Sequence, residues 1–210
     1  MREAMHASNE AGDAVEALTP EQFWRAFQSA ASSRTVAGGR PFGISWRTKQ
    51  VLERKLGSGD GRQQPGLMES IAQQLHLDYA REFYGYDAVF HRGKVSYGGQ
   101  AIRGRRTAPG EISVALEHEN DPETSQHELY KLSLLAVPLK VLVTYPLDYG
   151  HVGELLESYI GVLKVAPVNW IGTLLIIFGL PSQYPAFASW LAYVYDSDEI
   201  SFNLLGDLSP

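Results

Sequence analysis

Cysteine is absent from this chain of 210 residues, and long apolar runs are absent too. Without cysteine there is no thiol nucleophile, no thiolate zinc site and no disulfide framework. The longest mainly apolar run, Trp170 to Leu180, is too short to cross a bilayer as a helix. The first eighteen residues are polar and acidic, which argues against a signal peptide. We therefore expect a soluble, cytoplasmic protein with no membrane partner.

Basic side chains are scarce in the last third of the chain and concentrated near its middle. Residues 148–210 carry one basic and seven acidic side chains, within a net charge of −6. No acidic residue stands between Asp87 and Glu111, where five basic residues do: Arg92, Lys94, Arg103, Arg105 and Arg106. Because charges act over about 8–10 Å at physiological salt, this stretch can attract nucleic acid despite the negative total. The other interpretation is a solvated basic loop.

The chain length suits one domain with a small appendage. We expect residues 1–18 to form a flexible lead and residues 19–66 to form an N-terminal helical part of the same domain. Residues 67–210 then hold an α/β core with terminal strands. Thr19-Pro20-Glu21-Gln22 predicts a helix start, because Thr caps, Pro suits the first turn and Gln completes a capping box.

Apolar spacing predicts a helix followed by strands and helices in alternation. A hairpin with its turn at His91-Arg92-Gly93 is expected after the helix over 67–83. Further helices are predicted over 47–56, 121–135 and 152–165, and further strands over 112–119, 139–145, 173–178, 191–195 and 200–204. This order indicates the α/β class, with a central mixed sheet flanked by helices.

The strand from Ile112 to Glu119 carries the most informative pattern. Side chains alternate along a strand, so Glu117 and Glu119 project from the same face while His118 projects from the other. Two like charges this close repel unless a cation neutralises them. Hard divalent ions such as Mg²⁺ prefer such carboxylate oxygens. The alternative is that the strand simply reaches solvent at Glu117.

Two further residues join this acid pair in the interpretation. Asp87 begins the apolar stretch Ala88-Val89-Phe90, where an aspartate is costly to bury unless it is paired or binds metal. Lys131 lies on the helix after the acid pair, and its ammonium can reach the same place. Glu128 and Lys131 are also spaced as an ordinary surface ion pair on one helix face.

With these residues in order, the chain resembles the PD-(D/E)xK nuclease superfamily, the fold of restriction endonucleases. The resemblance covers about residues 67–145 and matches Asp87 to the first acid of the motif and Glu117 to the second. Glu119 stands where the family has lysine, and Tyr86 where it has proline. Some members carry the lysine on the following helix, as Lys131 would be here.

The resemblance implies a restriction-endonuclease-like core and a metal-dependent endonuclease. It places Glu69 where many members keep an auxiliary acid on the preceding helix. Asp87, Glu117 and Glu119 would bind Mg²⁺, for which Mn²⁺ substitutes, with the carbonyl of His118 as a further ligand. The partner would be nucleic acid, DNA by expectation, and a homodimer is left open.

The acids and the lysine also suit phosphodiester hydrolysis as chemistry. Glu119 can orient the attacking water as a general base, and Lys131 can stabilise developing negative charge. Two alternatives stand beside this one. The chain is a nucleic-acid-binding module that has lost turnover, or it is an interaction protein that uses aromatic residues of its acidic C-terminal part. Those aromatics, which also suit core packing, are Tyr184, Phe187, Trp190, Tyr193 and Tyr195.

Overall fold

The computed structural model describes residues 17–32, 66–97, 106–166, 172–180 and 189–208. For residues 96, 97, 106 and 107 it describes the backbone alone. The elements in these ranges are α1 (Pro20–Ser32), α2 (Leu67–Gln74), β1 (Asp78–Phe83), β2 (Tyr86–Tyr97), β3 (Arg106–His118), α3 (Ser125–Ser133), β4 (Leu139–Thr144), α4 (Tyr149–Val165), β5 (Thr173–Leu180), β6 (Ser189–Asp196) and β7 (Ser201–Leu208). Nearly all of the predicted flexible lead, and the helix predicted over 47–56, lie outside the described residues.

The strands form one sheet in which the spatial order follows the chain order from β1 to β7. β3, β4 and β5 are parallel to one another, and every other neighbouring pair is antiparallel. Parallel neighbours need a crossover, which α3 supplies between β3 and β4 and α4 between β4 and β5. The predicted α/β class with a mixed sheet is therefore confirmed.

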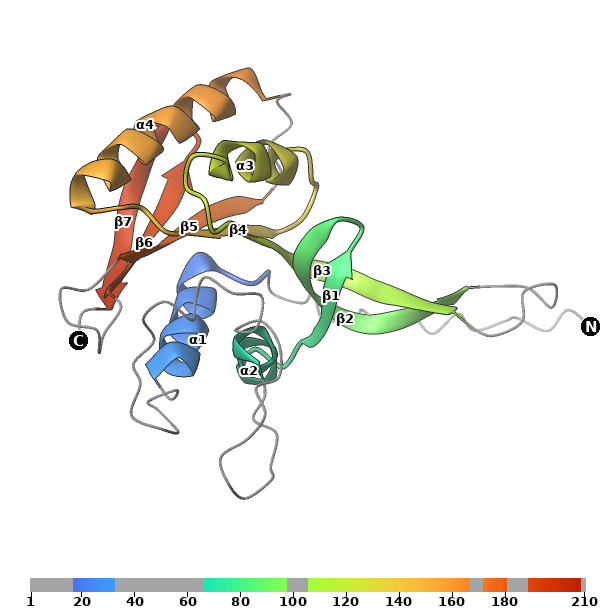
Figure 1. Ribbon diagram of the computed structural model, residues 1–210. Coiled ribbons are helices and arrows are strands. Elements are labelled where there is room, and N and C mark those ends of the chain that lie inside the picture. Colours follow the sequence, from blue (N-terminus) through green and yellow to red (C-terminus); the bar gives the residue numbers. More distant parts are fainter. Residues whose placement is uncertain (1–16, 33–65, 98–105, 167–171, 181–188, 209–210) are drawn as a thin grey trace, which may run out of the picture.

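The helices cover the sheet on both faces, with α1 and α2 on one side and α3 and α4 on the other (Figure 1). All six residues of β4 are buried, as expected for a central parallel strand with near-continuous apolar sequence. Leu139, Val141 and Val143 belong to the core under α1 and α2, whereas Leu142 belongs to the core under α3 and α4. The alternation along β3 and β4 thus sets which side chains meet α3.

The capping box predicted at the start of α1 is confirmed. The Thr19 N–H donates to Gln22 Oε1 at 2.9 Å, and the Gln22 N–H donates to Thr19 Oγ1 at 3.3 Å. The aromatic residue Trp190 of β6 is 2% exposed and meets Phe27 of α1 with ring centroids 5.0 Å apart. Core packing therefore accounts for Trp190. Within the described ranges, no helix has the length and apolar character needed to cross a membrane.

The helix predicted over 67–83 is wrong in its second half. α2 ends at Gln74, and Asp78–Phe83 forms β1 at the edge of the sheet. His76, with a φ of 54°, turns the chain out of the helix although it is not glycine. Pairing of β1 with β2 over Asp78↔His91 to Phe83↔Tyr86 then determines the conformation, which local spacing does not reveal.

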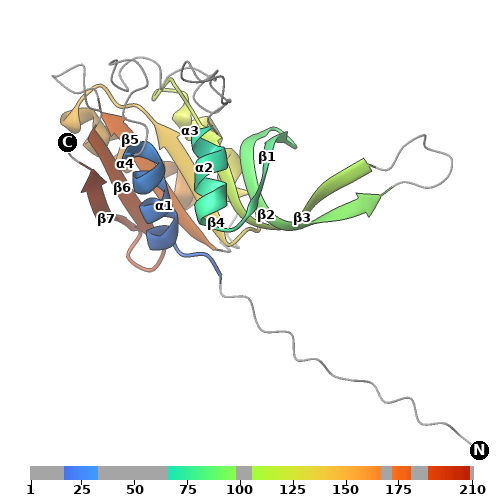
Figure 2. The same ribbon diagram turned by 90° about the horizontal axis from the view of Figure 1, so that it is seen from below.

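The hairpin turn predicted at residues 91–93 is also misplaced. The chain reverses at Tyr84 and Gly85, between β1 and β2. β2 continues through His91 and Gly93 with only a register shift between Phe90 and His91, and Gly93 takes a φ of 65° within the strand. β2 and β3 extend together well past the rest of the sheet as a two-stranded ribbon (Figures 1 and 2).

Candidate functional site

Asp87 and Glu117 stand on adjacent strands at the end of the ribbon nearest the core. Ala88 of β2 pairs with Leu116 of β3, so Asp87 and Glu117 occupy the next position of the same antiparallel ladder. The backbone N–H of His118 donates to Asp87 Oδ2 at 2.9 Å. This bond fixes the Asp87 carboxylate beside the last residues of β3. The structure therefore brings together two acids that lie thirty residues apart in sequence.

Glu117 is buried, with 2% of its surface exposed. The pKa of Glu117 is raised to about 8, chiefly by burial; Lys131 lowers it in part, and the negative charges of Asp87 and Glu128 also raise it. This pKa already includes the effect of Lys131, so a further cation, such as a metal ion, is needed to keep the carboxyl ionised at neutral pH.

Lys131 extends from α3 onto this pair of strands. Its Nζ lies 2.8 Å from Glu117 Oε1 and also pairs with Glu128 Oε2. The same Nζ donates to the Gly85 carbonyl at 3.0 Å and lies 5.4 Å from the centre of the Tyr86 ring. Partial burial acts to lower the pKa of Lys131, but its bonds to the two carboxylates outweigh burial and raise it. Lys131 is therefore held as a cation against Glu117.

Glu128 is a member of this cluster that the sequence interpretation did not count as a site residue. It lies one helical turn before Lys131 on α3, and its charge acts on Glu117, Lys131 and Tyr86. The i,i+3 spacing was visible in the sequence, where it predicted only a surface ion pair. Because Lys131 also contacts Glu117 of β3, the Glu128–Lys131 pair is part of the candidate site and not only a surface ion pair.

Glu119 and the imidazole of His118 are oriented differently from Glu117. Glu119 Oε1 accepts the Asp121 N–H at 2.8 Å, and its charge raises the pKa of Tyr159 on α4 in addition to the effect of burial. A 2.6 Å hydrogen bond joins His118 Nε2 and the Tyr145 hydroxyl. Burial lowers the pKa of His118 to about 4, so the ring is neutral at pH 7. Its side chain belongs to the core on the α1 side, as strand alternation predicts.

Glu69 lies on α2, on the face of the sheet opposite to α3. The pKa of Tyr79 on β1 is raised to about 12, chiefly by burial, and the negative charges of Asp87 and Glu69 contribute to this shift. The pKa of Tyr79 is therefore affected by both acids, Asp87 of β2 and Glu69 of α2. Glu69 is thus linked to Asp87 through Tyr79, from the face of the sheet opposite to Lys131.

The predicted nucleic-acid-binding residues follow the ribbon of β2 and β3. Lys94 is exposed and Arg92 is half-buried, and neither forms an ion pair with a residue that the structure describes. Arg106 begins β3, but its side chain is not described, and Arg103 and Arg105 lie outside the described residues. Arg92 and Lys94 thus lie on the part of the ribbon that leads away from Asp87, without an ion-pair partner among the described residues.

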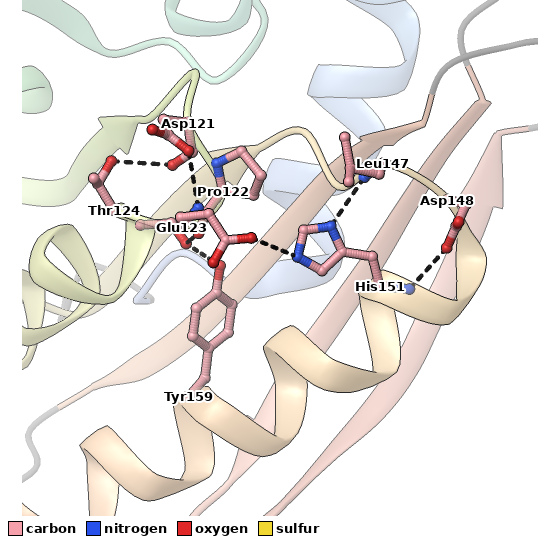
Figure 3. A network of polar contacts seen from close by, with 9 residues as sticks. Asp121, Pro122, Glu123, Thr124, Leu147, Asp148, His151 and Tyr159 are labelled. Atoms are coloured by element: carbon pink, nitrogen blue, oxygen red, sulfur yellow. Dashed lines mark hydrogen bonds and ion pairs between the residues drawn. The ribbon is translucent and has the colours of Figure 1, made fainter.

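A polar network anchors the loop that follows β3 (Figure 3). His151 Nδ1 accepts the Leu147 N–H at 3.1 Å, so a neutral imidazole carries its proton on Nε2, which lies 3.4 Å from Glu123 Oε1. Asp148 caps α4 by accepting the His151 N–H at 2.9 Å. These contacts tie the β3–α3 loop to the start of α4. They were not anticipated from the sequence.

Comparisons of the chain with other proteins add no family. No protein-family model matches it, and no curated protein does. Within the described ranges, no group of three or more His, Asp or Glu side chains is arranged to hold a metal ion. The candidate site therefore consists of two acids on neighbouring strands, Asp87 and Glu117, and the Lys131–Glu128 pair from α3.

Proposed function

We propose that this protein is a metal-dependent nuclease that hydrolyses phosphodiester bonds in DNA with Asp87, Glu117 and Lys131. The observation that supports this most directly is the 2.8 Å contact of Lys131 with buried Glu117, beside Asp87 on the next strand. The site is framed by the elements from α2 to β4. These are one helix, three antiparallel strands, a crossover helix and a parallel strand. That order agrees with a restriction-endonuclease-like core, which remains part of the proposal.

The residues present fit Mg²⁺ better than a metal held by protein alone. Mg²⁺ is usually bound by one or two carboxylates and completes its shell with waters and substrate phosphates. Asp87 and Glu117 supply two carboxylates, which suffices for that mode, and Mn²⁺ would substitute. When bound, such an ion polarises the phosphoryl oxygen and lowers the pKa of its water. The carbonyl of His118 is a further ligand in this proposal.

The chain's own groups then have distinct tasks. The His118 N–H orients Asp87, and the Lys131 ammonium lowers the pKa of Glu117 and offers charge to the phosphate in the transition state. Glu119 accepts a backbone N–H in its own loop, so we assign it first to shaping that loop. Glu119 can orient the attacking water only after its hydrogen bond with the Asp121 N–H opens.

The proposal is tested by incubating the purified protein with supercoiled plasmid and Mg²⁺ or Mn²⁺. We expect nicked and linear products with either ion and none with EDTA, because two carboxylates and a lysine cannot supply the metal's chemistry. A matched RNA substrate shows whether DNA is preferred. If the protein binds nucleic acid but cuts none with any divalent ion, the binding-module alternative is correct instead.

Replacing Arg92 and Lys94 together with glutamine should weaken DNA binding without stopping cleavage at saturating DNA. A two-stranded ribbon fits the major groove, and each phosphate contact adds about 0.9 to the slope of log K against log salt. The double variant should therefore bind duplex DNA with a slope smaller by about 2, measured by fluorescence anisotropy at several salt concentrations. Lys164→Gln, on the exposed face of α4, is the matched control. An unchanged slope would favour the solvated-loop interpretation.

A further inference from the structure

The turn between β1 and β2 carries an unusual residue for its backbone conformation. Phe83 pairs with Tyr86, which leaves Tyr84 and Gly85 as a two-residue turn. Their φ angles are 51° and 82°, positive at both central positions as in a type I′ turn. Asn, Asp or Gly is strongly preferred at the first of these positions, and a bulky residue there is a conformational outlier. Tyrosine at position 84 is therefore not explained by the turn.

Burial does not explain Tyr84 either. Its side chain is 85% exposed, the largest value among the exposed large hydrophobic residues in the part of the chain that the structure describes. The edge-on contact with Phe83, at 4.6 Å between ring centroids and 90° between planes, orients the ring. An oriented, exposed aromatic ring in an unfavourable backbone conformation indicates a role outside folding.

The turn is tied directly to the candidate site. Lys131 Nζ donates to the Gly85 carbonyl at 3.0 Å and lies 2.8 Å from Glu117 Oε1. The Tyr86 ring contacts the same ammonium from the other end of the turn. Figure 1 shows this turn on the side of the sheet that α3 covers. Tyr84 thus projects into solvent one residue away from groups that hold the acid site.

We propose that Tyr84 is a stacking platform for an unpaired nucleobase of the substrate, next to the phosphate that Glu117 and Lys131 serve. This rests on the proposed nuclease function and adds a specificity residue to it. Every base has a π-face, so stacking on tyrosine recognises single-stranded or unpaired nucleotides with little regard to sequence. The anchored turn would hold the ring in place while the basic ribbon contacts the phosphates.

The test uses a single-stranded oligonucleotide with one 2-aminopurine, whose fluorescence is quenched by stacking, in Ca²⁺ in place of Mg²⁺ to slow cleavage. We expect wild type and Tyr84→Phe to quench the probe and bind it equally. Tyr84→Asn should bind it about tenfold more weakly and lose the quenching, with a melting temperature equal to or above that of wild type, because asparagine suits the turn. Tyr149→Asn, another exposed tyrosine substituted in the same way, should change neither property.

Two results would overturn the inference, and they are distinguishable. If Tyr84→Asn binds and quenches the probe as wild type does while plasmid is still cut, Tyr84 has no stacking role and the nuclease proposal survives. If wild type binds neither the oligonucleotide nor plasmid DNA, the nuclease proposal and the stacking role both fail.

Discussion

Glu117→Gln is expected to abolish plasmid cleavage and, at the same time, to make the metal-free protein more stable above neutral pH. Cleavage is lost because glutamine is a poor ligand for a hard divalent ion. Stability rises because wild type must keep a carboxylate buried at 2% exposure, whereas the amide carries no charge. If Glu117 instead had a structural role, the Glu117→Gln variant would be less stable than wild type.

The pH dependence of this gain follows from the sign of the pKa shift. Burial raises the pKa of Glu117 from 4.5 to about 8 in the folded state. The protonated carboxyl is therefore favoured by folding, so its contribution is complete below the unfolded pKa and is lost as pH rises towards 8. The free energy of unfolding of wild type should fall by about 2–4 kcal/mol across this window, and that of Glu117→Gln should not.

The measurement is chemical denaturation in EDTA at pH 5 and pH 9, followed by circular dichroism, beside the plasmid assay in Mg²⁺. Glu154→Gln, an exposed glutamate on α4, is the matched control and should track wild type in both. Cleavage by Glu117→Gln at the wild-type rate would remove Glu117 from the site. Unfolding of the variant at both pH values would make Glu117 structural.

Lys131→Met should lower turnover by roughly 10²–10³-fold, because one charged group aimed at a transition state contributes about that factor. Methionine keeps most of the aliphatic stem, so packing of α3 on the strands should persist. DNA affinity should change little, since the ribbon carries the phosphate contacts in this proposal. Single-turnover cleavage and anisotropy measure the two effects separately.

Removing Lys131 also takes a cation away from Glu117, which raises the pKa of Glu117 further. The rates should therefore be compared at pH 7 and at pH 9. At pH 9 the loss of charge stabilisation persists, but protonation of Glu117 affects the rate less. Lys131→Arg is the second control, because it keeps the charge. If Lys131→Met cleaves as wild type does, Lys131 is only the partner of Glu128 on the helix surface.

Several features were determined by the sequence itself. The capping box of Thr19 and Gln22 is local chemistry, and it forms as expected. The apolar run of β4 and the alternation along β3, which turns Glu117 and His118 to opposite faces, follow from the two-residue period of a strand. These are properties of neighbouring residues, so the linear order alone contains them.

Tertiary structure decided the rest of the candidate site. Residues 78–83 follow a helix and have no strong strand pattern, yet they pair with β2 and move the reversal to Tyr84 and Gly85. Strand alternation predicts Glu119 on the same face as Glu117, but β3 ends at His118 and Glu119 accepts the Asp121 N–H in the following loop. Lys131 contacts Glu117, Glu128 and the Gly85 carbonyl, although Gly85 and Lys131 are 46 positions apart in sequence. Such contacts depend on which strands pair and how the helix packs on them, and no short-range period encodes that choice.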